Sequence, residues 1–283
     1  MRHIAFVTYQ KQPEIAQNDR LLVKPLKQMG IEVSPAPWDD DRNDWQSFDL
    51  AIFRSCWDYH LRFDEFTTWL TLMEKLRVPI WNPVPLVRWN AKKTYLLDLE
   101  KKGIPTIPTI LIHQGESKNL ADILNKEQWT TSVVKPIIGA WGYKVFKVNE
   151  TQALEKQKDF DILVKESDVV VQKFMEGVTG GEWSLVFFGG KHSHSFVRIP
   201  KKGDFRVNYA FGGIFHRQIA SQELIQQAEN VIKTLHAPTL YSRVDLVVDK
   251  EQIYCMELEL IEPYLYLDKT SAEMFAGAIA QII

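Results

Sequence analysis

A chain of 283 residues with 45% hydrophobic and 25% charged residues has the composition of a folded globular protein, and its length suits one large domain or two to three lobes around a cleft. Its formal net charge of -2 argues against a nucleic-acid partner held by bulk positive charge. No run approaches the ~18 apolar residues of a membrane span, and the first apolar run is too short for a signal peptide. Cys56 and Cys255 form no CxxC spacing, which argues against a zinc knuckle or redox pair. We therefore expect a soluble cytoplasmic protein without a membrane or nucleic-acid partner.

Residues 1–88 alternate strand and helix, as a small parallel α/β domain does. Helices are predicted from about Asn18 to Met29, where Gly30 ends the helix, and over FDEFTTWLTLMEKL. Buried strands are predicted for HIAFVTY, IEVSPAPW and DLAIFRS. The proline-punctuated stretch VPIWNPVPLV is a predicted hinge, and NAKKTYLLDLEKKG after it is a predicted helix with Asn90 as its cap.

Strands dominate from about Thr106 to the C-terminus. They are predicted for IPTILI, WTTSVVKPI, YKVFKV and DVVVQKF, and for a hairpin EWSLVFFGGKHSHSFVRI that turns at its paired glycines. A helix from about Ser221 to Leu235 precedes the last predicted hairpin, YSRVDLVVDKEQIYCMELEL. His192 and His194 alternate along a strand among serines, so we expect them to be solvated and not catalytic.

The stretch CMELELIEP, residues 255–263, places carboxylates in an apolar run that is typical of a buried strand. Side chains alternate along a strand, so Glu257 and Glu259 share one face. Burying two unpaired negative charges on one face costs too much free energy, so a buried face needs a cation, raised pKa values or basic partners. The alternative is an edge strand with one solvent-exposed face, and this stretch alone leaves both interpretations open.

Asp245 lies on the preceding strand, on the other side of the polar turn DKEQ. In an antiparallel hairpin it faces Glu257 only if the loop between the strands contains an odd number of residues. Three carboxylates would then converge, and oxygen ligands without His or Cys suit Mg²⁺ or Mn²⁺ better than zinc. The alternative is a polar hairpin with solvated acids, which the apolar residues between the acids disfavour.

Two further loops carry side chains that could bind anions. Lys135 ends a strand just before IIGAWG, whose Gly139 and Gly142 let backbone N–H groups approach a phosphate. No P-loop GK[ST] follows, and an ordinary hairpin turn is the simpler interpretation of this loop. Arg198 and Arg206 flank the glycine-rich IPKKGDFRVNYAFGG, and guanidinium groups bind carboxylate or phosphate through two hydrogen bonds. Surface arginines in a mobile loop are the alternative here.

The order of these motifs resembles the ATP-grasp superfamily, and within it the bacterial glutathione synthetase branch, from about Trp89 to the C-terminus. VVKPIIGAWG is similar to the family's lysine-and-glycine loop, VQKFMEGVTGGEWS to its adenine and ribose segment, VRIPKKGDFRVNYAFGG to its substrate loop, and RVDLV with MELELIEP to its metal strands. The resemblance implies an α/β protein with α+β lobes, in which a small parallel α/β domain (1–88) precedes an ATP-grasp domain (89–283). Within the second domain, 106–174 would be a mobile lid lobe and 175–283 the metal and catalytic lobe.

The resemblance also implies ATP and Mg²⁺ or Mn²⁺ as cofactors, and it assigns roles to single residues. The implied ATP contacts are Lys93, Lys135, Gly139, Gly142, Gln172, Lys173, Phe174 and Glu182, with Lys92 competing with Lys93 for the phosphates. Gln172 and the backbone of Lys173 and Phe174 would meet the adenine, and Glu182 would accept from the ribose. The implied metal ligands are Asp245, Glu257 and Glu259, and the implied catalytic residues are Arg206, Asn208 and Arg198.

The stretch RSCWDYH, residues 54–60, lies at the C-terminal end of a predicted strand, where open α/β sheets bind ligands. Together with ELELIEP it is similar to an ATP-grasp subgroup that includes the cycloserine-forming ligase of antibiotic biosynthesis. Arg54, Ser55, Asp58 and Glu262 are therefore candidate substrate residues. Arg54 and Asp58 could grip the carboxylate and ammonium of an amino acid, or they could pair with each other.

The implied activity is ATP-dependent ligation of a carboxylate to an amine through an acyl phosphate, with release of ADP and phosphate. The implied partners are small-molecule carboxylate and amine substrates, and a homodimer rests on family analogy alone. A small-molecule kinase on the same fold and a nucleotide-binding regulator without turnover remain alternatives. Two residues depart from the family pattern. Glu259 stands where Asn is frequent, which leaves the metal count open, and Trp141 replaces a smaller residue, so it either narrows the loop or stacks on a neighbour.

Overall fold

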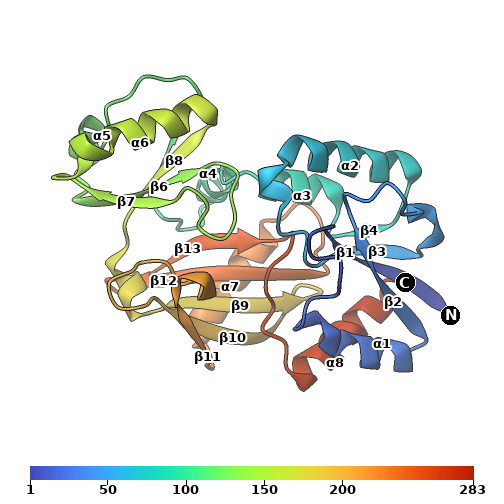
Figure 1. Cartoon of the computed structure of the whole chain (residues 1–283). Helices are drawn as coiled ribbons and strands as arrows, with labels where there is room; N and C mark the ends of the chain where they lie inside the picture. The colour runs from blue at the N-terminus through green and yellow to red at the C-terminus, as the bar shows by residue number, and fades with distance from the viewer.

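The computed structural model describes residues 1–283 except for the side chain of Tyr209, and its strands form three sheets (Figure 1). The first sheet is parallel, with the order β2-β1-β3-β4. Its strands are β1 (Arg2–Thr8), β2 (Ile31–Pro37), β3 (Leu50–Phe53) and β4 (Ile80–Trp81), and the helices of this region are α1 (Val23–Gln28), α2 (Phe63–Leu76) and α3 (Val84–Asn90). Every residue of β3 is buried, as expected for a parallel strand covered on both faces.

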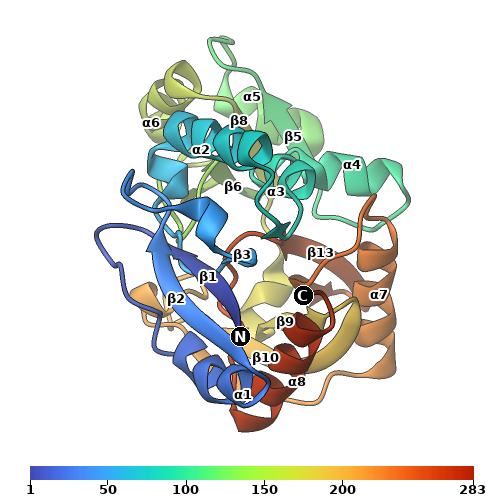
Figure 2. The same cartoon turned by 90° about the vertical axis from the view of Figure 1, so that its right-hand side faces the viewer.

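The second sheet is antiparallel and has the order β11-β10-β9-β12-β13. Its strands are β9 (Glu182–Phe188), β10 (Lys191–Ile199), β11 (Ile214–Arg217), β12 (Tyr241–Asp249) and β13 (Gln252–Glu259). Helix α7 (Gln222–Lys233) packs against β12 and β13, and α8 (Lys269–Ala280) packs against β9, β10 and α1 (Figure 2). The strand that carries Glu257 and Glu259 is thus an edge strand.

The third sheet, β5-β8-β6-β7, is antiparallel and forms a separate lobe with two helices (Figure 1). Its elements are β5 (Thr109–Ile112), α5 (Leu120–Glu127), β6 (Thr131–Pro136), β7 (Phe146–Asn149), α6 (Ala153–Glu166) and β8 (Val169–Lys173). Helix α4 (Tyr95–Lys101) lies before this lobe in the chain, and short 3₁₀ helices occur at Asp19–Leu22, Trp45–Ser47, Tyr59–Leu61, Glu176–Gly180 and Tyr209–Phe211.

The first and second sheets share a hydrophobic core, whereas the third sheet has its own. Phe6 of β1 lies in one cluster with Tyr241 of β12 and Phe275 of α8. The Tyr241 hydroxyl lies 2.7 Å from the carbonyl oxygens of both Phe53 and Ile261, so it ties β3 to the segment after β13. The third lobe packs its helices onto its sheet in a separate cluster. The lobe of the third sheet therefore has a hydrophobic core that is separate from the core shared by the first and second sheets.

Two predictions about local structure are wrong. Asn90 does not cap a helix, because it is the last residue of α3 and α4 begins only at Tyr95. Its side chain instead donates to the Leu258 carbonyl (2.7 Å) and accepts from the Leu260 N–H (2.9 Å), which satisfies the free edge of β13. His194 is not solvated: it is 4% exposed and its Nε2 lies 2.8 Å from the Leu265 carbonyl. Burial lowers the pKa of His194 to about 4.

Helices α5, α6 and α8 and strand β11 were not predicted, although the predicted helix over FDEFTTWLTLMEKL coincides with α2. The predicted hinge VPIWNPVPLV contains β4 and the first turn of α3. Among the described residues, no helix combines the length and the apolar character that crossing a membrane requires.

Candidate active site

A cavity of about 580 Å³ lies between the three sheets and collects most of the predicted site residues. The predicted residues that line it are Lys93, Lys135, Gly139, Gly142, Gln172, Lys173, Phe174, Glu182, Arg198, Arg206, Asn208, Glu257, Glu259 and Glu262. Lys92 is exposed and is absent from this lining, so Lys93 is the lysine of this pair that faces the cavity.

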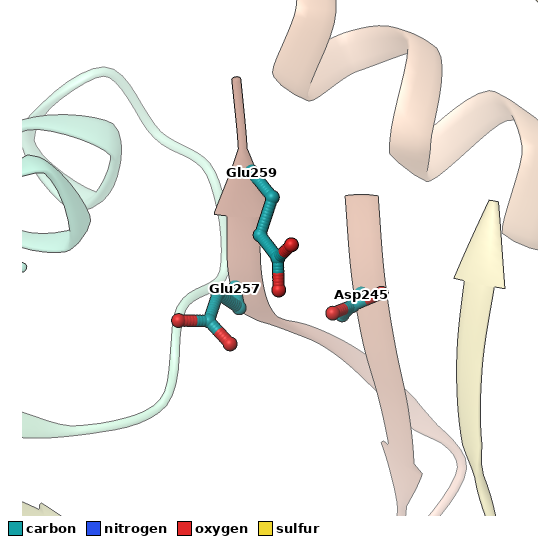
Figure 3. A group of neighbouring side chains, drawn as sticks. All are labelled: Asp245, Glu257 and Glu259. Atoms are coloured by element: carbon teal, nitrogen blue, oxygen red, sulfur yellow. The ribbon is translucent and has the colours of Figure 1, made fainter. Parts of the chain in front are cut away.

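The turn between β12 and β13 brings three carboxylates together. Lys250 and Glu251 form a two-residue turn with φ of 48° and 67°, and this even-numbered loop alone would put Asp245 opposite Met256. A β-bulge next to Asp245 adds one residue on β13, so Asp245 pairs with Glu257 instead. Oxygen atoms of Asp245, Glu257 and Glu259 lie within 4.8 Å of one another (Figure 3).

Asp245 is fully buried behind the cavity wall, and its oxygens already have protein partners. It accepts two hydrogen bonds of 2.9 Å from Arg243, one of 2.5 Å from Arg198 and one of 2.7 Å from the Ser184 hydroxyl. Arg243 also pairs with Glu259, and Arg198 with Glu182. Two buried arginines thus alternate with the acids and offset their charge.

The acids that face the cavity differ in their protonation. Burial acts to raise the pKa of Glu257, but the charges of Lys93 and Lys135 lower it to about 2, and Lys93 lies 2.8 Å away. Burial raises the pKa of Glu259 to about 7 against the opposing charge of Arg243, with Glu257 adding to the rise. Burial likewise raises the pKa of Glu182 to about 7, against Arg198. The sequence predicted that buried acids here need basic partners or raised pKa values, and both occur in this site.

The glycine loop after β6 reaches the N-terminal domain through aromatic contacts. The ring of Trp141, whose φ is 58°, lies 5.5 Å from the ring of Trp57 at 75°, and the ring of Tyr143 lies 5.4 Å from that of His60. Gly142 has φ of 74°, and a Cβ there would lie 3.0 Å from the Phe211 ring. Trp141 thus packs edge-to-face on a neighbour, which answers the question that the sequence left open.

Arg206 lies next to the glycine loop and is held by its own neighbours. Its guanidinium lies 3.5 Å from the centre of the Phe211 ring and pairs with Asp204 at 2.8 Å. The bonds from Arg206, together with backbone N–H groups, lower the pKa of Asp204. Arg206 and Asn208 both line the cavity, so a cation and an amide face the space above the acids.

In the segment expected to meet the adenine, two backbone N–H groups already have protein partners. The backbone N–H of Lys173 donates to Pro108 and that of Phe174 to Thr131, each at 3.0 Å, so neither is free for a ligand. Gln172 donates to the Thr109 hydroxyl at 2.9 Å, and within the described part of the chain its buried Oε1 has no partner. Gln172 Oε1 is thus an acceptor available to a ligand in this cavity.

The structure does not bring Arg54, Ser55 or Asp58 to the cavity lining. Arg54 is buried, pairs with Asp19 at 3.0 Å and donates to the Pro263 carbonyl at 3.2 Å. Asp58 pairs with Arg62 at 2.7 Å and accepts from the Trp38 indole at 2.9 Å. The two residues therefore do not pair with each other. Arg54 pairs instead with Asp19, which is distant in the sequence, and Asp58 pairs with Arg62, four residues further along the chain.

Two residues at the site were missed by the sequence reasoning. Arg243 lies two residues before Asp245 on β12, and the alternation of a strand could have indicated that they share a face. The Tyr95 hydroxyl accepts from the Leu258 N–H at 3.0 Å and helps to fix β13, but no local signal links the two residues.

Comparison with known proteins identifies the family. Residues 99–256 match the model for the ATP-grasp domain of prokaryotic glutathione synthetase, and residues 4–82 match the model for the N-terminal domain of the D-cycloserine synthetase DcsG. The chain belongs to the ATP-grasp ligases. The resemblance, the ATP-grasp fold after a parallel N-terminal sheet, and the class of ATP-dependent carboxylate-amine ligase are thereby confirmed.

Relatives and solved structures support the same placement. The cycloserine biosynthesis protein DcsG of Streptomyces lavendulae is 30% identical over 279 residues, which cover 92% of each chain. A glutathione synthetase of Ralstonia nicotianae is 22% identical over 258 residues, 86% of this chain and 76% of the relative. The crystal structure of D-cycloserine synthetase DcsG has a TM-score of 0.87 at 28% identity and covers 99% of both chains. A D-alanine–D-alanine ligase from Bacillus anthracis, with a TM-score of 0.70 at 19% identity, shares the fold.

Proposed function

We propose that this ATP-grasp ligase joins the carboxylate of a small amino-acid-like substrate to an amine through an acyl phosphate. The observation that carries the proposal is that Lys93, Lys135 and Arg206 face the same cavity as Glu257 and Glu259. Phosphoryl transfer needs positioning and charge neutralisation more than a protein nucleophile, and these side chains supply both.

In the proposed reaction a carboxylate oxygen of the substrate attacks the γ-phosphorus of ATP and ADP leaves. The nitrogen of the amine then attacks the acyl carbon, and phosphate leaves with the carboxylate oxygen. Lys93 and Lys135 would hold the ATP phosphates, and Arg206 with Asn208 would face the transferred group, with Arg198 nearby. Burial lowers the pKa of Lys135, and the neighbouring Lys93 lowers it further, while Glu257 and Glu182 oppose the change.

Asp245, Glu257 and Glu259 fit Mg²⁺ or Mn²⁺, because three oxygen donors within 4.8 Å suit a hard divalent cation. When bound, the ion would neutralise charge on the phosphate oxygens. Glu257 and Glu259 face the cavity, whereas Asp245 lies behind Arg198 and Arg243. Binding of the ion therefore requires Asp245 and Glu259, which pair with these arginines, to coordinate the ion as well.

Residues 106–174 would close over the cavity as a lid. The separate hydrophobic cluster of this lobe supports movement as a unit, and the rings of Trp57 and Trp141 join its glycine loop to the N-terminal domain. Closure would exclude water, which otherwise hydrolyses an acyl phosphate. The proposal covers two forms of the second step, in which the amine belongs either to a second molecule or to the same molecule as the acid.

An isotope experiment tests the proposal. A candidate acid labelled with ¹⁸O in its carboxylate is incubated with MgATP and the protein, with and without candidate amines. Transfer of one ¹⁸O into the released phosphate is the expected result, and it should depend on the added amine whenever the acid carries no amine that can attack its own acyl group. A stable phosphorylated product without amine dependence would point to a kinase, and ATP binding without any release of ADP would point to a regulator.

A further inference from the structure

Strand β13 is the outer strand of the second sheet, and from Leu258 onward its outer backbone groups bond to side chains instead of another strand. The Leu258 N–H donates to the Tyr95 hydroxyl at 3.0 Å, and the Leu258 carbonyl accepts from Asn90 Nδ2 at 2.7 Å. The Leu260 N–H donates to Asn90 Oδ1 at 2.9 Å, and the Leu260 carbonyl accepts from Asn82 Nδ2 at 2.7 Å. Three side chains thus satisfy the row of backbone groups that a further strand would otherwise pair with.

These bonds fall on the peptide groups that flank two acids of the cavity. Asn90 bonds to the backbone carbonyl immediately before Glu259 and to the backbone N–H immediately after it. Tyr95 accepts from the N–H of the peptide bond that follows Glu257. Because a peptide group is planar and rigid, fixing it restricts where the neighbouring side chain can lie. The side chains of Asn90 and Tyr95 therefore act on the positions of both carboxylates.

The segment that carries Asn90 and Tyr95 also reaches one of these acids directly. Lys93 lies between them in the chain, and its Nζ lies 2.8 Å from Glu257 Oε1. Residues 90–95 thus hold Glu257 through its carboxylate and through the backbone beside it. Both polar atoms of the Asn90 side chain are already bonded to β13, and Asn90 and Tyr95 are buried. Asn90 therefore acts on the site through the strand.

We propose that Asn90 and Tyr95 are positioning residues, which fix β13 so that Glu257 and Glu259 are held ready for a divalent cation. This inference rests on the proposed function and adds to its site two residues that act through the backbone. A strand that is fixed before the ion arrives loses less conformational freedom when the ion binds. Loosening the outer edge of β13 should therefore weaken binding of the ion more than binding of the nucleotide itself.

Calorimetric titration of the full chain with ADP, once with Mn²⁺ and once with EDTA, tests the inference. The ratio of the two affinities isolates the contribution of the ion from that of the nucleotide. The variants are Asn90→Ala, which removes both bonds around Glu259, and Tyr95→Phe, which removes one hydroxyl and keeps the ring. Asn18→Ala is the matched control, because Asn18 makes the same pair of bonds, each of 2.9 Å, to the N–H and carbonyl of Leu267 in the segment before α8. Urea unfolding measures the stability of each variant.

We expect the wild type to bind ADP more tightly with Mn²⁺ than with EDTA. Asn90→Ala should lower this ratio of affinities about 10-fold or more, as loss of a residue that orients metal ligands does. Tyr95→Phe should lower it about 2- to 10-fold, because it loses a single hydrogen bond. Asn18→Ala should lose stability but keep the ratio of the wild type. The affinity for ADP in EDTA should be the same in all four proteins.

An unchanged ratio in Tyr95→Phe would overturn the inference, and this variant decides alone if Asn90→Ala fails to fold. An equal fall of the ratio in Asn18→Ala would also overturn it, because the loss would then follow from lower stability and not from the edge of β13. Equal affinities with Mn²⁺ and with EDTA in the wild type would overturn it as well. Failure of the proposed function has a different signature, because the wild type would then show no ADP binding or no ¹⁸O transfer.

Discussion

Two acids that line the same cavity, Glu257 and Glu262, differ in their cationic neighbours. Glu257 pairs with Lys93, and the charges of Lys93 and Lys135 lower its pKa to about 2 against the effect of burial. Five residues further along the chain, burial and the nearby charge of Glu259 raise the pKa of Glu262 to about 8. The residue type and burial are alike, so the nearby lysines account for the difference in pKa between Glu257 and Glu262.

Removing Asp245, the acid that two arginines share, should have the largest effect on stability. In Asp245→Asn, Arg198 keeps only Glu182 and Arg243 keeps only Glu259, and breaking a buried ion pair costs about 3–5 kcal/mol. Urea unfolding of the metal-free and nucleotide-free protein measures this loss. Asp159→Asn breaks an exposed pair with Lys156 and should cost less than about 1 kcal/mol. Equal losses in the two variants would show that the buried pairing contributes little.

Glu257→Gln should have the largest effect on activity. It removes a carboxylate that both pairs with Lys93 and belongs to the candidate metal group, so we expect ADP release from MgATP to fall about 100-fold or more. Steady-state assays at saturating Mg²⁺ measure the change, with Glu273→Gln, which changes an exposed carboxylate on α8, as the control. Activity of Glu257→Gln near that of the wild type would show that Glu257 takes no part in the reaction.

Much of this site could be predicted from the sequence because its signals are local. Alternation along β13 put Glu257 and Glu259 on one face, and the glycine loop, the arginine loop and the acidic hairpin follow in the order of the family. The turn at Lys250 and Glu251 was also visible as a polar interruption. Such patterns depend on residues a few positions apart, which a single chain displays directly.

The rest could not be predicted because it depends on contacts between distant segments. The pairing of Asp245 with Glu257 needs a bulge that no turn rule indicates. Arg54 was a candidate for the substrate because it directly follows β3, yet it pairs with Asp19, which lies in a 3₁₀ helix earlier in the chain. That Glu262 is left without a partner could be recognised only once Lys93, Arg243 and Arg198 had been placed beside other acids.

The pH dependence of stability should reveal the unpaired acid. The folded-state pKa of Glu262 lies near 8 and its ordinary value is 4.5, so between these values the folded state holds a proton that the unfolded state has lost. Its contribution therefore favours folding at low pH and is lost as the pH rises from 4.5 to 8. Glu262→Gln should make this decline shallower by up to about 1.4 kcal/mol per pH unit.

Denaturant unfolding of the ligand-free protein at pH 5, 6, 7 and 8 provides that measurement. Glu257 should not contribute to this range, because its lowered pKa confines its effect to pH values below about 4.5. Parallel curves for the wild type and Glu262→Gln would mean that the Glu262 carboxyl already has a partner in solution, which would remove its difference from Glu257.

The smallest expected effect lies at the contact between the glycine loop and the N-terminal domain. Trp141 is 43% exposed, so Trp141→Ala should hardly change stability, but it removes the ring contact with Trp57 that holds the glycine loop toward the N-terminal domain. An aromatic pair contributes about 0.5–1.5 kcal/mol, which corresponds to a rise of about 2- to 13-fold in KM for ATP with a smaller change in kcat. Trp57→Ala loses the same ring contact and also the hydrogen bond from its indole to the Glu262 carbonyl, so its effect should be at least as large. The double variant should be no worse than Trp57→Ala, because that single change already removes the ring contact. Additive effects would show that the two rings act separately and that the glycine loop is positioned by Phe211 and Arg206 alone.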